Sequence, residues 1–336
     1  MLAAFAVLAF DYTNGFHDAA NAVATVIASR AMTPAQAVLV VGVFEFLGPL
    51  LGGTAVANTI GGFVDLGDLP VTLSLGVVLA ALIGAIAWNL LTWWRGIPSS
   101  SSHALVGALV GAAVTASSNG HVVWGFAALL QGRLEGVAKV LLALLLSPLL
   151  GFGVGFLLHK FLMLAFRAAR PSVNRHLRRA QFVTAAGLAF SHGANDAQKS
   201  MGVLTLLLLL GGFLPRFEVP LWVMLACATA MTVGTLSGGW RIVRTLGFAV
   251  YKVRPLHAFD SQLTSAVVIL SASLAGAPVS TSHVVASSIM GIGCSERPRR
   301  VRWGKAGEIA LTWVVTLPAS AAAGALMLLV LRPLVE

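Results

Sequence analysis

Charged residues are scarce in this sequence. Only 10% of its 336 residues are Asp, Glu, Lys or Arg, whereas 57% are hydrophobic. A soluble domain carries about 25% charged residues, and a chain of this size cannot hide so much apolar area from water. The scarcity of charge therefore excludes an ordinary soluble protein and indicates that lipid surrounds much of the chain.

Cysteine is rare, and catalytic motifs are not found. Two cysteines, Cys227 and Cys294, form neither a disulfide framework nor a metal-ligand spacing. The sequence has no P-loop, no zinc motif and no Ser–His–Asp order, so we expect a protein that is not an enzyme and has no catalytic residues. Met1–Phe10 is apolar but lacks the basic start of a signal peptide. As a helix it rises only about 15 Å, so we expect a half-helix or a start upstream.

Long apolar runs are present instead. Val71–Leu91, Val137–Phe166 and Ala306–Leu331 reach or approach the roughly 20 residues that cross a bilayer as a helix. Backbone polar groups in hydrocarbon must bond internally, which favours helices, and the alternating segments of a membrane barrel are not seen. The sequence therefore predicts an all-α, polytopic membrane protein.

Basic residues gather in two short segments, which accounts for much of the net charge of +10. One lies within residues 167–179 and the other within residues 297–305. Short basic loops beside membrane spans mark the cytoplasmic side, and they also attract anionic lipid. We therefore predict a cytoplasmic position for both segments and no nucleic-acid partner.

Three motifs occur twice, in the same order. Gly15–Asn21 matches Gly193–Lys199, Gly52–Gly61 matches Gly238–Gly247, and Gly96–His103 matches Gly276–His283. The offsets are 178, 186 and 180 residues. Near-constant offsets predict a duplicated chain, with a first repeat at 1–166, a basic linker at 167–180 and a second repeat at 181–336. The repeats can be parallel or inverted, and duplicated transporters place their site between the repeats.

The first motif places ionisable residues within apolar sequence. Such groups are costly at membrane depth, so they usually pair or line a wet cavity. Asn14 and Gly15 predict a helix break, after which Asp18 lies near a helix start and can cap its N–H groups. The repetition of Asp18 as Asp196 makes a functional site as good an interpretation as capping alone.

The third motif is rich in hydroxyl groups. Pro98–His103 and Pro278–His283 each precede a small, apolar stretch, so each predicts a loop that opens into a helix N-terminus. Free N–H groups and hydroxyls there can hold an oxyanion, although ordinary serine capping is the alternative. His103 and His283 can carry protons. We favour satisfied structural donors for them, as for His17 and for His192.

Lys199 breaks the symmetry, because its counterpart is the neutral Asn21. It follows Asp196 by three residues, so on a helix the two share a face. Either Lys199 offsets the charge of Asp196, or it holds an anion or replaces a coupling cation.

At these motifs the sequence resembles the inorganic phosphate transporter (PiT) family, in particular the bacterial low-affinity phosphate carriers. The resemblance implies about 10–12 transmembrane segments, inverted repeats with broken helices and hairpins, a homodimer, and a multi-pass protein of the inner membrane. It also implies phosphate import by symport with H⁺ or Na⁺ and no cofactor, and some relatives carry a divalent metal–phosphate complex. By motif, the implied phosphate-binding residues are Asn21, Ser100, Ser101, Ser102, Lys199, Ser280, Thr281 and Ser282. The expected coupling-cation residues are Asp18, Asp196, Asn14 and Asn195.

Electrostatics gives a reason for symport. Asp18 and Asp196 would repel phosphate in a low-dielectric site, so a proton, Na⁺, a divalent metal or Lys199 must bridge them. The bound cation then favours the anion, and the anion favours the cation. Because Lys199 occupies one of two equivalent positions, we predict proton rather than sodium coupling. A symporter for another oxyanion such as sulfate, and an anion channel, are the alternatives.

Overall fold

The chain is almost entirely helical. The computed structural model describes residues 1–117, 121–238, 242–243, 245, 247 and 250–335. Within these residues the only β-type pairing is an isolated bridge between Val64 and Val122. The predicted all-α class is therefore confirmed.

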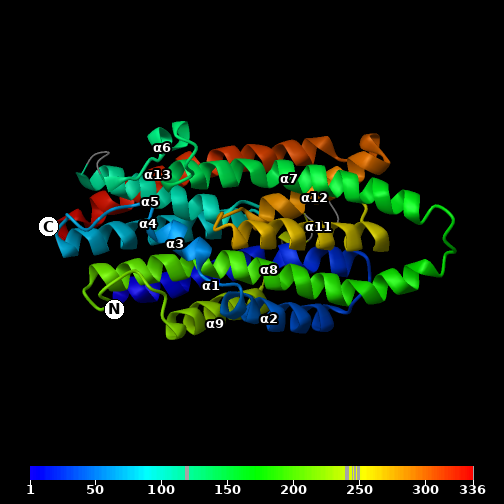
Figure 1. Ribbon diagram of the computed structural model, residues 1–336, viewed down its shortest axis with the longest axis horizontal. Helices are drawn as coiled ribbons and strands as arrows, with labels where there is room; N and C mark the ends of the chain where they lie inside the picture. The colour runs from blue at the N-terminus through cyan, green and yellow to red at the C-terminus, as the bar shows by residue number, and fades with distance from the viewer. Residues whose placement is uncertain (118–120, 239–241, 244, 246, 248–249, 336) are drawn as a thin grey trace.

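Most of the helices run along one axis and form an elongated bundle (Figure 1). They are α1 (Leu2–Ala28), α2 (Pro34–Leu51), α3 (Ala55–Gly61), α4 (Val71–Trp94), α5 (Ser101–Ser117), α6 (Phe126–Leu130), α7 (Gly136–Ala165), α8 (Val173–Leu210), α9 (Leu221–Ser237), α11 (Pro255–Leu274), α12 (Thr281–Glu296) and α13 (Trp303–Val335), with a short 3₁₀ helix η3 (Pro298–Arg300). The second Gly-Gly segment, Gly238–Gly247, lies partly outside the described residues.

Four helices in the described part of the chain, α2, α4, α7 and α13, are long and apolar enough to cross a membrane. Helices α1, α8 and α11 are also of spanning length, but they carry many buried polar side chains. The expected half-helix at the N-terminus is wrong. Residues from Leu2 onward belong to one 27-residue helix, which rises about 40 Å.

The predicted helix break at Asn14 and Gly15 is also wrong, because α1 runs through it without interruption. The glycine has a different purpose. A Cβ on Gly15 would lie 2.1 Å from the backbone oxygen of Met231 in α9, and a Cβ on Gly193 would lie 2.2 Å from that of Glu45 in α2. These glycines allow α1 and α8 to approach their neighbours closely, as small residues do between membrane helices.

The two halves of the sequence interlock. Helix α1 packs on α9, whereas α2 packs on α8; likewise α5 packs on α13, whereas α12 packs on α7. Each pair joins one helix before the basic linker to one after it. The contact of α2 with α8 thus has the reverse order of halves to that of α1 with α9, and the same holds for α7 with α12 and α5 with α13. Such exchange is expected of two repeats that fold together; the repeats themselves and their inverted orientation stay predictions.

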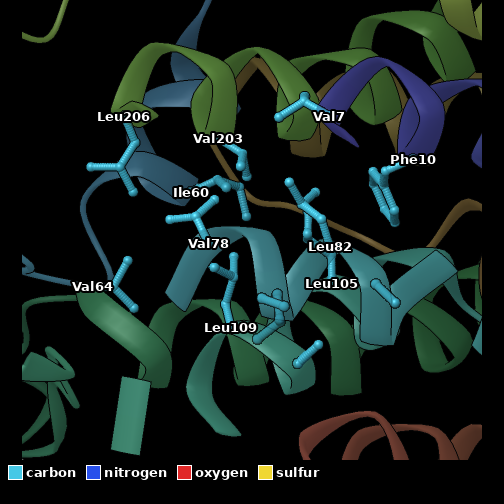
Figure 2. Close-up of a cluster of buried hydrophobic side chains, with 14 of the residues drawn as sticks. Val7, Phe10, Ile60, Val64, Val78, Leu82, Leu105, Leu109, Val203 and Leu206 are labelled. Atoms are coloured by element: carbon cyan, nitrogen blue, oxygen red, sulfur yellow. The ribbon is translucent and has the colours of Figure 1, made fainter. Parts of the chain in front are cut away.

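A cluster of buried apolar side chains holds the first-half helices against α8. Figure 2 shows Val7 and Phe10 of α1, Leu82 of α4 and Leu105 of α5 within it, and all four are at most 1% exposed. Because lipid tails are as apolar as leucine, close packing rather than escape from water holds such helices together. The cluster fixes α1, α4, α5 and α8 against one another.

Both basic segments lie at the same end of the molecule. The connection from α7 to α8 and the connection from α12 to α13 are at the end opposite the C-terminus (Figure 1). The predicted linker is partly helical, because α8 begins at Val173. Their shared end agrees with a common side of the membrane, but their cytoplasmic position stays a prediction.

Candidate functional site

Four helices converge on the candidate site. Asp18 lies in the second half of α1, and Asp196 lies within α8. Helices α5 and α12 begin beside these aspartates, and their first residues come from the two hydroxyl-rich loops. The third repeated motif was predicted to open into helix N-termini, and the structure confirms this.

Asp18 accepts a hydrogen bond from one hydroxyl of each loop. The Ser101 Oγ donates to Oδ2 at 3.0 Å, and the Ser282 Oγ donates to Oδ1 at 2.9 Å. His17 lies against the same carboxylate, with its Nδ1 at 2.8 Å from Oδ1. A carboxylate from the first half is thus bound by hydroxyls from both halves.

Asp196 has a more strongly cationic setting. The Thr281 Oγ1 donates to Oδ2 at 2.9 Å, and the Lys199 ammonium pairs with Oδ1. The Lys199 Nζ also donates to the Ser102 Oγ at 2.5 Å and to the carbonyl oxygen of Val279 at 2.9 Å. Lys199 therefore offsets Asp196 and joins both loops.

The predicted asparagines occupy different places. Asn21 is part of the cluster, since its Nδ2 donates to the Ser282 Oγ at 2.8 Å. Asn195 donates to the Ser273 Oγ at 2.9 Å, which ties α8 to α11. Among the described residues, the buried Oδ1 atoms of Asn14 and Asn195 have no hydrogen-bond partner. Both oxygens are therefore unused acceptors in the described part of the chain.

Ser100 and Ser280 differ from the other loop hydroxyls. The Ser100 Oγ accepts from the backbone N–H of His103 at 3.1 Å, and the Ser280 Oγ accepts from that of His283 at 3.3 Å. These are helix N-caps, each satisfying an N–H group at the start of α5 or α12. The capping interpretation therefore describes these two residues, whereas their neighbours contact the aspartates and Lys199.

His192, expected to be a structural donor, also lies at the site, together with Glu45, which was not predicted. The His192 Nδ1 lies 2.6 Å from the Glu45 Oε1, and its Nε2 lies 3.3 Å from the Asp196 Oδ2. One ligand atom each from Asp18, His192 and Asp196 lie within 4.8 Å of one another, a spacing that suits a bound cation. The i,i+4 spacing of His192 and Asp196 could have revealed the histidine, but the sequence carries no signal for Glu45.

Two other histidines of the repeated motifs, His17 and His283, have different surroundings. His17 is a satisfied structural group as predicted, with its Nε2 at 3.1 Å from the Thr92 Oγ1 and at 3.2 Å from the Ser99 Oγ. For His283 that prediction is wrong. Neither of its ring nitrogens has a hydrogen-bond partner among the described residues, and its ring packs 4.6 Å from that of His103. Helices α5 and α12 meet through this ring contact.

The cluster is closed to solvent and poor in positive charge. Asp18, Asp196 and Lys199 are 2%, 0% and 3% exposed. Two carboxylates with oxygens within 4.8 Å of each other repel by at least about 3 kcal/mol at an effective dielectric constant of 20. The Lys199 ammonium pairs with Asp196, so a further cation near Asp18 would relieve the repulsion.

Comparisons with known proteins agree on one family. A family model described as the phosphate transporter family matches residues 14–170 and 163–324. The chain is 45% identical to a probable low-affinity inorganic phosphate transporter of Bacillus subtilis (strain 168), over 99% of this chain and 97% of that one. It is 41% identical to a protein of the same name from Rhizobium meliloti (strain 1021), over 95% of this chain and 92% of that one.

A solved structure shares the fold. It is described as the sodium-dependent phosphate transporter and superimposes with a TM-score of 0.87 at 24% identity. The match covers 99% of this chain and 98% of that one. At this identity the likeness concerns the fold alone.

Proposed function

The chain belongs to the phosphate transporter family, and from that premise we propose that it imports inorganic phosphate by symport with a cation. Membership places it among transporters rather than enzymes. We further propose that it works in the inner membrane as a homodimer, with residues 167–180 and 297–305 in the cytoplasm. The observation that carries the transport proposal is the set of hydroxyl donors from both loops that converge on Asp18 and Asp196.

Phosphate oxygens would replace the two carboxylates as acceptors of the hydrogen bonds from the loop hydroxyls. The hydroxyls of Ser101, Thr281 and Ser282 donate to carboxylate oxygens, and Lys199 donates to the Ser102 hydroxyl. Phosphate oxygens accept from the same kinds of donor, and the N-termini of α5 and α12 add a favourable dipole. Lys199 can pair with phosphate as it pairs with Asp196. Binding is therefore an exchange of acceptors at one set of donors.

The exchange releases two carboxylates, which need a positive partner. Asp18, His192 and Asp196 offer a cation three ligand atoms. The Oδ1 atoms of Asn14 and Asn195 are neutral oxygens that have no hydrogen-bond partner among the residues the structure describes. A bound cation would raise the affinity for phosphate, and bound phosphate would raise the affinity for the cation, since linkage between the two sites is reciprocal. These groups suit a proton on a carboxylate or on His192, or a small metal cation. We propose proton coupling, because Lys199 already supplies one fixed positive charge.

A closed site also favours a carrier over a channel. The binding groups are buried, so an ion reaches them only when the surrounding helices part toward one side of the membrane. Helices α5 and α12 begin at the site and pack on α13 and α7 from the other half, so relative movement of these pairs would open it. Alternating access at a central site is the usual mechanism of duplicated transporters.

Uptake of labelled phosphate into proteoliposomes tests the proposal. Asp196→Asn keeps the shape of the side chain but removes its charge, and we expect uptake to fall at least tenfold. The matched control is Glu308→Gln, which makes the same change on the exposed surface and should leave uptake unchanged. Wild-type uptake by Asp196→Asn would contradict the proposal.

The same vesicles test coupling and substrate. We expect an imposed pH gradient to drive uptake, and we expect a sodium gradient at fixed pH not to drive it. Uptake that requires sodium would overturn proton coupling while leaving phosphate transport intact. Unlabelled sulfate in excess should not compete, and strong competition would favour a broader oxyanion carrier.

A further inference from the structure

A cavity lined by basic side chains lies away from the central site, at the end of the molecule that carries the basic connections (Figure 1). Its volume is about 880 Å³. The described residues that line it include no acid and five cationic side chains. These are Arg30, Lys252, Arg254, Arg300 and Arg302. They come from separate segments, namely the end of α1, the approach to α11 and the connection from α12 to α13, so folding gathers them.

The first of these arginines stands in a backbone conformation that favours glycine. Arg30 has φ of 56°, and it is the one non-glycine residue with positive φ in the part of the chain that the structure describes. The N–H of Arg30 donates to the carbonyl of Ile27, and the N–H of Ala31 donates to that of Val26. This is the helix ending in which glycine usually occupies the left-handed position. Backbone conformation alone therefore does not explain an arginine here, which indicates a task for its side chain.

One acid lies beside the cluster and is fully engaged. Glu296 pairs with Arg254, accepts the hydroxyl of Tyr251 at 2.8 Å and lies 2.9 Å from the Nε2 of His257. This network holds Arg254 at the cavity wall, where it lines the hollow with the four other cationic side chains. A concave surface with charge of one sign concentrates its field on an ion of the other sign.

Membrane topology by itself does not require this arrangement. Basic residues mark the cytoplasmic side wherever they lie in a short loop, as do the exposed arginines of residues 167–179. Those arginines do not line the cavity. Convergence from three segments on one hollow is a feature of a binding site rather than of a topology signal.

We propose that this cavity binds an anion that carries phosphoryl groups, held by Arg30, Lys252 and Arg300 with Arg254 and Arg302. Guanidinium groups match phosphate oxygens with paired hydrogen bonds, and the volume falls within the range of small-molecule sites. A single orthophosphate would fill little of this space, so the cavity suits two or more phosphoryl groups or a phospholipid headgroup. The site is distinct from the central one, since it is exposed, and its binding does not rest on the transport proposal.

Two measurements on the purified, full-length protein distinguish the sources of the anion. Titration calorimetry with pyrophosphate in a neutral detergent detects a free anion. Native mass spectrometry after incubation with cardiolipin, compared with phosphatidylcholine, detects a bound anionic lipid. The test variant is Arg30→Gly with Arg300→Gln, and the control is Arg175→Gln with Arg178→Gln, which removes two exposed charges from the same end.

We expect the test variant to bind at least one of the two probes about tenfold more weakly than the wild type, and the control to bind like the wild type. Loss of pyrophosphate binding identifies a free anion as the occupant, and loss of cardiolipin alone identifies a headgroup. Arg30→Gly alone should also weaken binding without lowering the Tm, because glycine suits the backbone there. Absence of binding to the wild type, or equal binding by the test variant and the control, overturns the proposal.

Discussion

Removal of the Lys199 ammonium is the most informative perturbation of the central site. Lys199→Gln deletes the ion pair to Asp196 and the bonds to the Ser102 hydroxyl and the Val279 carbonyl. It leaves Asp196 buried at 0% exposure, with Asp18 close by and without its ammonium partner. Breaking a buried pair by removing one partner costs about 3–5 kcal/mol.

The double variant Lys199→Gln with Asp196→Asn shows whether this cost comes from the stranded charge. Because no uncompensated carboxylate remains at Asp196, we expect the double variant to regain most of the stability that Lys199→Gln loses. For a chain of this length, a loss of 3–5 kcal/mol lowers the Tm by roughly 4–7 °C. The measurement is thermal unfolding of the purified protein in detergent, followed by circular dichroism.

An exposed pair provides the control. Arg216→Gln removes a cation from a surface ion pair with Glu218, in which both side chains are more than two-thirds exposed, so the Tm should not change. A Lys199→Gln variant as stable as the wild type would refute the charge argument. So would a double variant less stable than either single one. Uptake should be lost in both Lys199 variants whatever their stability, because the phosphate site has lost its fixed cation.

Three further outcomes follow from other parts of the structure. Gly15→Ala places a Cβ 2.1 Å from the Met231 carbonyl and should lower stability by about 1–3 kcal/mol, whereas Gly153→Ala, with no atom within 4 Å, should not; thermal unfolding compares them. Ser282→Ala removes a donor to Asp18 and the acceptor for Asn21, so the KM for phosphate uptake should rise at least about tenfold, while Ser237→Ala on the exposed end of α9 should leave it unchanged. Burial opposes ionisation of Glu296, but hydrogen bonds from Arg254 and Tyr251 lower its pKa from 4.5 to about 2. Its stabilising contribution is therefore complete above pH 4.5 and declines as the pH falls toward 2, so the Tm deficit of Glu296→Gln should be larger at pH 7 than at pH 3; an equal deficit would count against the ion pair.

Composition and repeated motifs were enough to predict the class and much of the candidate site. Scarce charge and long apolar runs exclude an aqueous fold, whichever helices later pack together. The repeated Asp18 and Asp196 and the two hydroxyl loops pointed to one centre, because duplicated motifs occupy equivalent positions in the two halves. The structure does bring these groups together, and their roles in binding stay predictions.

Tertiary structure decided what depends on neighbours distant in the sequence. Gly15 looked like a helix break, but it is a contact point with Met231, and only the packing of α1 on α9 reveals this. Glu45 carries no local signal, and it matters because α2 lies against α8 and brings it to His192. The five cations that line the basic cavity are likewise scattered along the chain. A local pattern determines the periodicity and polarity of a segment, whereas the partner that a side chain meets is determined by how the helices pack.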